Sequence, residues 1–388
     1  MGEHADEAWM REAFAMGGVK ERNVTIISEP FMPEIQNNVP IPDAKKKVTK
    51  RARAAASKKA NEPKANPAAG LIQQLQFIAM AQKPAGTAYQ THCMINSRWA
   101  VAFDGVLTVG TPIQEDIQAC PNTTQLLAAL QRCGEQVQIS QVSDGVIVVK
   151  SERFRASIDC IPFNELPPSW PDVAQGPVTD ALKTGFAAVN WLINETATEA
   201  WKQAILLQNF TMVASEGHAL VEFMHGIQLP ISILLPKAAI NAVMKHDKPL
   251  VAMGVSDNSA TFHYADNSFI KTQLFKDNYP NYLPVFEGFD GETTPIPDDF
   301  FTGIDSVAPF CKDSKALYIQ GDKLQSHKEE ERGAVYQMSA ALHENIIFNY
   351  EFLKAVKPYF SNVVFDKERG KVFFRTNNLR GAIMRMTT

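Results

Sequence analysis

The stretch QVSDGVIVV, Gln141–Val149, decides the fold because the chain repeats it. The run GVSDNSATF, Gly254–Phe262, has the same character, and VVFDKERGKVFF, Val363–Phe374, offers a third copy. The aspartates of the three copies are almost equally spaced along the chain: Asp144, Asp257 and Asp366. Self-similarity at a fixed period indicates a chain built from repeated structural units. The sequence therefore predicts three consecutive units of similar length.

Two further landmarks recur in the same order. FNELP at residues 163–167 follows the first copy, and PNYLP at residues 280–284 follows the second. Upstream, AFDG at residues 102–105 matches ASEG at residues 214–217, with nearly the same spacing. In the upstream match a glycine stands at a polar corner between two apolar runs, which is typical of a hairpin turn that needs a positive φ. A corner that recurs is more easily explained by architecture than by a single active site.

Each unit shows two helical patterns, with short alternating strands between them. The first helices are predicted over residues 68–83, 179–194 and 297–310. The second helices begin near Asn122, Pro236 and Asn349, where the asparagines suit N-caps and the proline suits a first helical turn. The expected fold class is α+β, with a unit of helix, strands, helix and strands repeated three times.

Composition places the chain among ordinary globular proteins. It has 388 residues, of which 45% are hydrophobic and 21% charged, enough for two or three domains. No run of 18 apolar residues exists, and the acidic start MGEHADEAWMREAF lacks the apolar region of a secretory signal. The five cysteines form no CxxC pair, and their odd number argues against a disulfide or zinc framework. We therefore expect a cytoplasmic protein with reduced thiols and no membrane contact.

The N-terminal segment, residues 1–67, differs from the rest in charge. Residues 44–64 hold nine Lys or Arg against the single acid Glu62. Residues 1–67 carry 12 basic and 9 acidic residues, whereas residues 68–388 carry 26 and 33, so the body is net negative. This composition predicts a flexible basic tail. Three roles remain open for it: contact with nucleic acid, contact with the acidic body, or service as a solubilising linker.

His218 stands at the second of the two matching corners, in the run VASEGHALVEF. A catalytic role requires a nucleophile, metal ligands or a paired carboxylate, and the neighbours are Ser215, Glu216 and His225. The chain also lacks a GxxxxGK[ST] phosphate loop, metal-spaced carboxylates and a recognisable triad. We predict a structural corner in a protein that is not an enzyme and has no metal or cofactor. The alternative, with His218 and Glu216 as acid and base, requires an enclosed polar cleft around His218.

Three consecutive α+β units of this layout, with these motifs, resemble the bacterial sliding clamp, the β subunit of DNA polymerase III. The likeness covers residues 68–386, and the order and spacing of five segments make it specific. The segments are VASEGHALVEF at 213–223, LPISILLPKAAINAVMK at 229–245, FKDNYPNYLPVF at 275–286, IIFNYEFLKAVK at 346–357 and AIMRM at 382–386. Residues 1–67 have no counterpart in the family pattern. That tail and the divergent first unit favour a phage-encoded or mobile-element member.

The resemblance implies both an architecture and a function. Each subunit would carry three clamp domains, at residues 68–174, 175–291 and 292–388, with antiparallel sheets outside and helices around a hole. Two subunits would close into a six-domain homodimeric ring that encircles duplex DNA without sequence preference. Such a ring is a replication processivity factor: it tethers a DNA polymerase and is opened by a clamp loader, and both partners bind it through short linear peptides. The alternative is a clamp-like protein-interaction scaffold that does not load on DNA.

The faces of the helices extend this expectation. Along residues 179–194, the apolar stripe of Leu182, Phe186, Val189 and Ile193 should pack on sheets. The polar stripes are solvated surface or, on the resemblance, the wall of the DNA hole. The residues expected to face DNA are Lys83, Arg132, Lys183, Asn190, Lys237, Lys245, Lys354 and Lys357. The three acids Asp298, Asp299 and Asp305 make the third unit's first helix acidic, which predicts weak DNA binding by protein that is not loaded.

The resemblance also implies two protein-binding surfaces. The peptide groove would be lined by Ser215, Gly217, His218, Ala219, Leu220, Pro280, Val285, Ala382, Met384 and Met386. At the dimer interface, Phe154 and Ala156 of one subunit would lie opposite Pro309 and Phe310 of the other. Methionines and small aliphatic side chains suit a groove that accepts several related peptides. The alternative is that the two methionines only close the core of the last domain.

Overall fold

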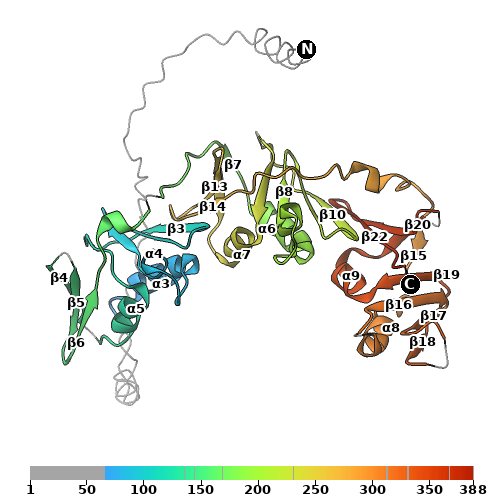
Figure 1. Ribbon diagram of the computed structural model, residues 1–388, viewed down its shortest axis with the longest axis horizontal. Coiled ribbons are helices and arrows are strands. Elements are labelled where there is room, and N and C mark those ends of the chain that lie inside the picture. The colour runs from blue at the N-terminus through green and yellow to red at the C-terminus, as the bar shows by residue number, and fades with distance from the viewer. Residues whose placement is uncertain are drawn as a thin grey trace, which may run out of the picture. The chain divides into compact units, whose positions relative to one another are not determined.

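The computed structural model describes residues 66–134, 136–143, 145–167, 169–229, 231–311, 313–329, 332–366 and 368–387, with the backbone alone at residue 344 (Figure 1). The described residues of Lys64–Thr388 form one compact body, which contains the three repeated units. The basic tail predicted over residues 1–67 lies outside the described residues, except for Asn66 and Pro67. Asn66 donates from Nδ2 to the carbonyl groups of Leu130 at 3.0 Å and Cys133 at 3.3 Å. It therefore belongs to the packed part of the chain.

The first unit contains two main helices and six strands. Its elements are α3 (Ala69–Ile78), the 3₁₀ turn η2 (Ala79–Ala81), α4 (Ala88–Thr91), β1 (Met94–Asn96), β2 (Trp99–Phe103), β3 (Leu107–Pro112), α5 (Thr123–Gln131), β4 (Gln138–Ser143), β5 (Val146–Ser151) and β6 (Phe154–Asp159). The predicted N-cap of α5 is confirmed, because the Asn122 side chain accepts a hydrogen bond from the backbone N–H of Gln125.

The second unit repeats this order with two more strands, β7 before its first helix and β11 before its second. Its elements are β7 (Gly176–Pro177), α6 (Ala181–Val189), η4 (Asn190–Leu192), η5 (Ala200–Gln203), β8 (Ala204–Leu207), β9 (Thr211–Ser215), β10 (Ala219–Met224), β11 (Ile233–Pro236), α7 (Lys237–Lys245), β12 (Leu250–Val255), β13 (Ser259–Tyr264), β14 (Phe269–Gln273) and η6 (Leu283–Phe286). Pro236 ends β11 and stands at the N-cap of α7, where it has no backbone N–H to leave unpaired.

The third unit follows the same plan. Its elements are β15 (Thr294–Pro295), α8 (Phe300–Val307), η7 (Ala308–Phe310), β16 (Ala316–Gly321), β17 (Lys323–Gln325), β18 (Val335–Gln337), β19 (His343–Asn349), α9 (Tyr350–Ala355), η8 (Lys357–Tyr359), β20 (Asn362–Asp366), β21 (Lys371–Arg375) and β22 (Leu379–Met384). Asn349 caps α9 as predicted, accepting from the backbone N–H of Glu351 at 2.9 Å. The threefold repeat of helix, strands, helix and strands is therefore present.

Two sheets run across unit boundaries. The seven-stranded sheet has the order β1-β2-β3-β14-β13-β12-β7, and the eight-stranded sheet has the order β11-β8-β9-β10-β22-β21-β20-β15. We count the strands of each unit from its two main helices, which are α3 and α5, α6 and α7, and α8 and α9. In both sheets, the third strand after one unit's first main helix pairs antiparallel with the third strand after the next unit's second main helix: β3 with β14, and β10 with β22. The two remaining sheets, β4-β5-β6 and β18-β17-β16-β19, each belong to one unit.

The apolar faces of helices and sheets meet in a core with members in all three units. The predicted stripe on the second unit's first helix is confirmed: Leu182, Phe186 and Val189 are 0% exposed and Ile193 is 4% exposed. Within each unit the two main helices contact each other, α3 with α5, α6 with α7 and α8 with α9 (Figure 1). Among the described residues, no helix is long and apolar enough to cross a membrane.

The corners predicted to match in the first two units are built alike. The carboxylate of Asp104 accepts from the N–H groups of Val106 and Leu107, and that of Glu216 accepts from the N–H groups two and three residues on. The glycine after each acid has a positive φ, 104° at Gly105 and 108° at Gly217. A side chain resists that conformation, which explains the glycine at this place in both units.

Candidate functional site

The corner between β9 and β10 is held by its own side chains. Ser215 Oγ donates to the Ala219 carbonyl at 2.8 Å and accepts from the Gly217 N–H at 3.1 Å. Glu216 Oε1 accepts from the N–H groups of His218 at 2.5 Å and Ala219 at 2.8 Å. These bonds fix the backbone, and they leave the His218 ring outside the corner.

The last strand of the chain runs beside this corner. In the β10–β22 pair, Leu220 lies opposite Ala382, and the Met384 N–H donates to the His218 carbonyl at 2.7 Å. Met386 continues away from the corner, because its N–H donates to Ile347 of β19 at 2.8 Å. The structure thus brings the corner and Met384 together, as predicted, and places Met386 against the third unit's first sheet.

An apolar cluster lies on the face of the eight-stranded sheet that carries Leu220 and Ala382. Leu220 and Ala382 belong to a buried group, and Val285, from the η6 segment at the end of the second unit, packs against it. The full cluster is Val213, Leu220, Phe286, Val364, Phe373 and Ala382, with Leu206, Tyr279, Tyr282, Val285 and Phe289 partly buried around it. Three predicted groove residues therefore share one buried apolar cluster, whereas Pro280 is exposed.

A polar network, which sequence reasoning missed, fastens the segment over the sheet. The Tyr282 hydroxyl donates to Glu222 Oε1 at 2.9 Å and accepts from Gln208 Nε2 at 2.8 Å. The Glu222 carboxylate also pairs with Arg380, whose guanidinium lies 4.2 Å from the centre of the Phe286 ring. Burial, followed by the bond to Glu222, raises the pKa of Tyr282 to about 12, so the hydroxyl keeps its proton at neutral pH. The only sequence signal was that Tyr282 lies in the PNYLP landmark.

The position of His218 does not suit catalysis. Its side chain is 75% exposed, and its Nδ1 lies 3.5 Å from Glu216 Oε1, a carboxylate oxygen already holding two backbone N–H groups. The enclosed polar cleft that the enzymatic alternative requires is therefore missing at His218. The side chain of Lys202 instead lies near Gly217, pairs with Glu199 at 2.9 Å and covers the ring of Trp201. The ion pair with Glu199 neutralises this lysine at the rim of the corner.

The residues predicted to face DNA fall into two groups. Several are engaged within the protein: Lys183 with backbone carbonyl groups after α7, Lys237 with Ile193, Asn190 with Asn241, Lys354 with Asp305 at 2.7 Å, Lys83 with the Asp104 carbonyl at 3.4 Å, and Lys357 over the Phe301 ring. Arg132 and Lys245 are exposed and have no ion pair or hydrogen bond from their side chains within the described residues. These two are the cations most available to a phosphate.

The three acids predicted for the third unit's first helix lie at its start and within it. Asp298 and Asp299 precede α8, and Asp299 accepts hydrogen bonds from the N–H and hydroxyl of Ser339, both at 2.9 Å. Asp305 is in the helix and is neutralised by Lys354. The carboxylates of Asp298 and Asp299 therefore stand at the start of the helix, and only Asp305 lies within it, paired with Lys354.

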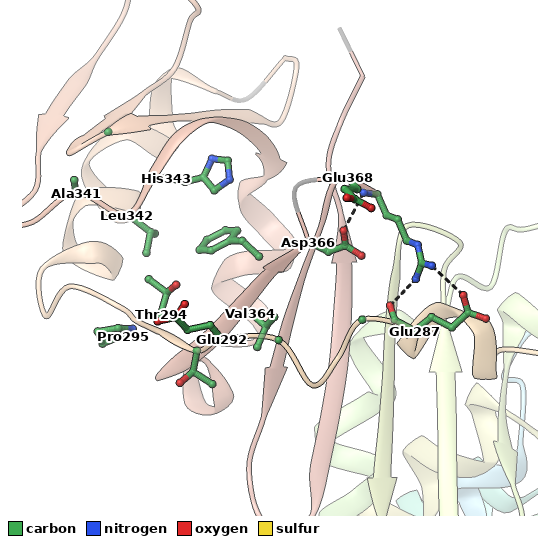
Figure 2. A pocket seen from close by; sticks show the side chains of 16 residues that line it. Glu287, Glu292, Thr294, Pro295, Ala341, Leu342, His343, Val364, Asp366 and Glu368 are labelled. Carbon is green, nitrogen blue, oxygen red and sulfur yellow. Dashed lines mark hydrogen bonds and ion pairs between the residues drawn. The ribbon is translucent and has the colours of Figure 1, made fainter.

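A large cavity of about 1200 Å³ lies between the inter-unit segment and the third unit (Figure 2). Its walls carry the carboxylates of Glu287, Glu292, Asp366 and Glu368, and the Arg369 guanidinium pairs with Glu287 at 3.2 Å. None of the predicted site residues lines it. A wall of this charge repels phosphate, so the cavity does not extend a DNA-binding surface.

The residues predicted for a dimer contact lie on two separate parts of the fold. Phe154 and Ala156 are on β6, at one edge of the sheet β4-β5-β6. Pro309 and Phe310 are in η7, after α8, and Phe310 is 58% exposed. α8 packs against β18, the edge strand of the third unit's first sheet, where Gly303 leaves room for the Tyr336 ring.

Comparison with known proteins identifies the fold. No protein-family model matches the chain, and no curated protein does. The DNA polymerase III subunit beta from Pseudomonas aeruginosa matches with a TM-score of 0.68 and 13% sequence identity, over 82% of this chain and 98% of that chain. The sliding clamp from Bacillus subtilis matches at 0.69 with 15% identity, over 82% and 97%. A sliding clamp from Bartonella birtlesii bound to griselimycin matches at 0.69 with 15% identity, again over 82% and 97%.

Sequence identities this low show the fold alone. The chain has the mixed helix-and-sheet fold of DNA polymerase sliding clamps, and the predicted fold class is confirmed.

Proposed function

We propose that this protein is a DNA sliding clamp: a homodimeric ring that encircles duplex DNA and tethers a DNA polymerase, with no catalytic activity of its own. The observation that carries the proposal is the strand pairing between units. At both joints within the chain, the third strand after one unit's first main helix pairs with the third strand after the next unit's second main helix, β3 with β14 and β10 with β22.

The same rule leaves one strand of each kind at a free edge. β18 is the third strand after α8, the first main helix of the third unit. β6 is the third strand after α5, the second main helix of the first unit. Both strands lie at sheet edges within the described residues. Unpaired edges invite pairing with another chain. If β18 of one chain pairs with β6 of a second, the twofold axis makes the reciprocal pair as well. Six units, joined by six contacts of one kind, then close a ring.

The proposed interface accommodates the residues predicted for it. Phe154 and Ala156 lie on β6 itself, and the exposed Phe310 follows the helix that packs on β18. The clamp domains would be residues 68–174, 175–291 and 292–388. We place the protein in the cytoplasm of a bacterium or of an infected cell, and we infer a phage or mobile-element origin from the added basic tail.

The groove beside the corner would receive the partner peptides. Leu220, Val285 and Ala382 supply an apolar floor, and Met384, joined to His218 through the backbone, supplies an adaptable wall. A polymerase and a clamp loader that present short linear peptides of apolar character would bind there in turn. His218 would act at the rim of the groove as part of the turn.

The test is topological and needs no loader. The protein is dissociated in mild denaturant, reassociated with nicked circular duplex DNA, and separated by gel filtration in high salt. We expect it to remain with the circles and to leave when a single cut linearises them, because linkage resists salt whereas phosphate contacts do not. Equal release from circles and linear molecules would contradict encirclement and favour a scaffold that does not load.

Charge variants test the wall of the hole in the same assay. Arg132→Glu with Lys245→Glu should lower the yield of loaded circles, because these two exposed cations guide phosphates during closure. Arg98→Glu with Lys276→Glu is the matched control, since it reverses two exposed charges that lie outside the main helices and away from the proposed dimer edge. An equal loss in both variants would show a general charge effect and remove the two residues from the hole.

A further inference from the structure

A second pocket opens at the far end of β10, away from the corner. Its volume is about 330 Å³, and its apolar part is formed by Met224, Phe289 and Leu379. Two guanidinium groups, those of Arg375 and Arg380, stand among the lining residues. We name it the Met224 pocket. None of the residues predicted for the peptide groove lines it.

Strand geometry separates this pocket from the groove. Alternate residues of a strand share a face, so Leu220, Glu222 and Met224 lie in a row along β10. A rise of about 3.3 Å per residue puts Leu220 and Met224 about 13 Å apart. The middle of the row is filled by Glu222 with Arg380 and Tyr282. A ligand side chain in one site therefore does not reach the other.

The pocket combines an accessible apolar surface with an unneutralised cation. Met224 is 59% exposed, unusual for a large apolar side chain at the end of a strand. The Arg375 guanidinium lies 5.5 Å from the centre of the Phe289 ring and has no carboxylate partner among the described residues. Arg380, in contrast, is paired with Glu222. Arg375 is thus held by stacking, with its hydrogen-bond donors left for a ligand.

We propose that the Met224 pocket docks a short segment of a partner protein in which a bulky apolar residue is followed directly by an acidic one. The apolar side chain would fill the space between Met224 and Phe289, where the methionine adapts to its shape. The carboxylate would accept two parallel hydrogen bonds from Arg375, the geometry in which arginine binds carboxylates best. The site is separate from the corner groove and does not depend on the ring.

The test uses fluorescence anisotropy with two fluorescein-labelled, C-terminally amidated peptides, Ser-Gly-Phe-Asp-Gly-Ser and Ser-Gly-Phe-Asn-Gly-Ser. We expect the full-length protein to bind the Asp peptide about tenfold more tightly than the Asn peptide, a difference of one charge-assisted contact. Arg375→Gln should remove that preference. Met224→Ser should weaken both peptides. Arg98→Gln, at an exposed arginine of the first unit, is the matched control and should change neither affinity.

The outcomes separate this site from the corner groove. Unchanged affinity in Met384→Ala supports the Met224 pocket, whereas loss in Met384→Ala with full binding in Arg375→Gln would place the peptide in the groove and overturn the proposal. Equal affinity of the wild-type protein for both peptides, or no saturation of the Asp peptide up to about 1 mM, would also overturn it. Thermal melts of each variant confirm that a loss of binding is not a loss of folding.

Discussion

Lys183 and Lys237 cap each other's helices. Lys183, near the start of α6, donates to the carbonyl groups of His246 at 2.9 Å and Lys248 at 2.7 Å, just after the end of α7. Lys237, the first residue of α7, donates to the Ile193 carbonyl at 3.0 Å, just after the turn that follows α6. Each lysine places a positive charge at the negative end of the opposite helix dipole. The pair thus locks the two helices antiparallel, and neither ammonium group is free for DNA.

Lys183→Met should therefore destabilise the fold rather than weaken DNA binding alone. The variant removes two charge-assisted hydrogen bonds from a side chain that is 18% exposed, and we expect unfolding free energy to fall by about 1–2 kcal/mol. Denaturant unfolding measures the change. Lys245→Met removes an exposed charge from the last residue of α7, the helix that Lys183 caps, and should be nearly neutral. Equal effects of the two substitutions would show that capping by Lys183 contributes nothing.

The groove beside the corner gives a second prediction. Met384→Ala with Met386→Ala should weaken binding of a Gln-Leu-x-Leu-Phe type peptide at least about tenfold, or about 1.4 kcal/mol, with the oligomeric state unchanged. Of the two single variants, Met384→Ala should weaken peptide binding more, since the backbone of Met384 is bonded to the corner and that of Met386 to β19. Calorimetric titration measures both. His218→Gln should change affinity only modestly, and full affinity in the folded double variant would exclude the groove.

The free edges give a third prediction, on the size of the particle. The native protein should have twice the mass of its 43.0 kDa chain, and Phe154→Asp should shift it toward the monomer, because a charge would enter the proposed β6–β18 contact. Sedimentation equilibrium at micromolar concentration decides this. Phe163→Asp replaces an exposed phenylalanine of the same unit and serves as the control for the half-buried Phe154. A monomeric native protein would contradict the ring.

Asp172 gives a fourth prediction, on pH. Its carboxylate accepts from Ser259, Thr261 and Lys271, and Lys271 also reaches the Trp170 carbonyl, so the segment between the first two units is fastened to the sheet. Burial raises the pKa of Asp172, but these hydrogen bonds and the lysine charge lower it more, and the net pKa is below its ordinary value.

A folded pKa below the unfolded one means stability that is fully present above about pH 4 and is lost as pH falls through the folded pKa. Asp172→Asn should therefore lower the free energy of unfolding by about 1–2 kcal/mol at pH 7 and by progressively less in acid. Chemical denaturation at several pH values measures the difference. Asp277→Asn, at an exposed position, should show no such trend. If the change in free energy of unfolding were independent of pH, packing of the Asp172 side chain, rather than its charge, would hold the segment on the sheet.

The sequence was sufficient for features that depend on neighbouring residues. The caps Asn122 and Asn349, the buried stripe from Leu182 to Ile193, and the glycine corner at Gly217 all follow from local patterns, and all are present. The repeat then predicted three similar α+β units, because three copies of one pattern constrain each other where a single copy is ambiguous.

Features that join distant segments could not be predicted in this way. Lys183 bonds to residues 63 and 65 positions away, and Tyr282 reaches Glu222 across 60 positions. Nothing in a helix face distinguishes a lysine that caps another helix from one that faces solvent. The Met224 pocket was missed for the same reason, since Met224, Phe289 and Arg375 meet only when two units share a sheet.

The open edges of β6 and β18 also bear on the fate of a newly made chain. In the proposed ring these edges are covered, whereas a chain without its second copy would expose backbone groups with which other extended segments can pair, and such edges nucleate aggregation. β18 limits this exposure by being only three residues long, and β6 by carrying the exposed charges of Arg155 and Asp159. Brevity and charge at these edges disfavour indiscriminate pairing, so under the proposed ring a second copy that fits both edges at once would be favoured over other partners.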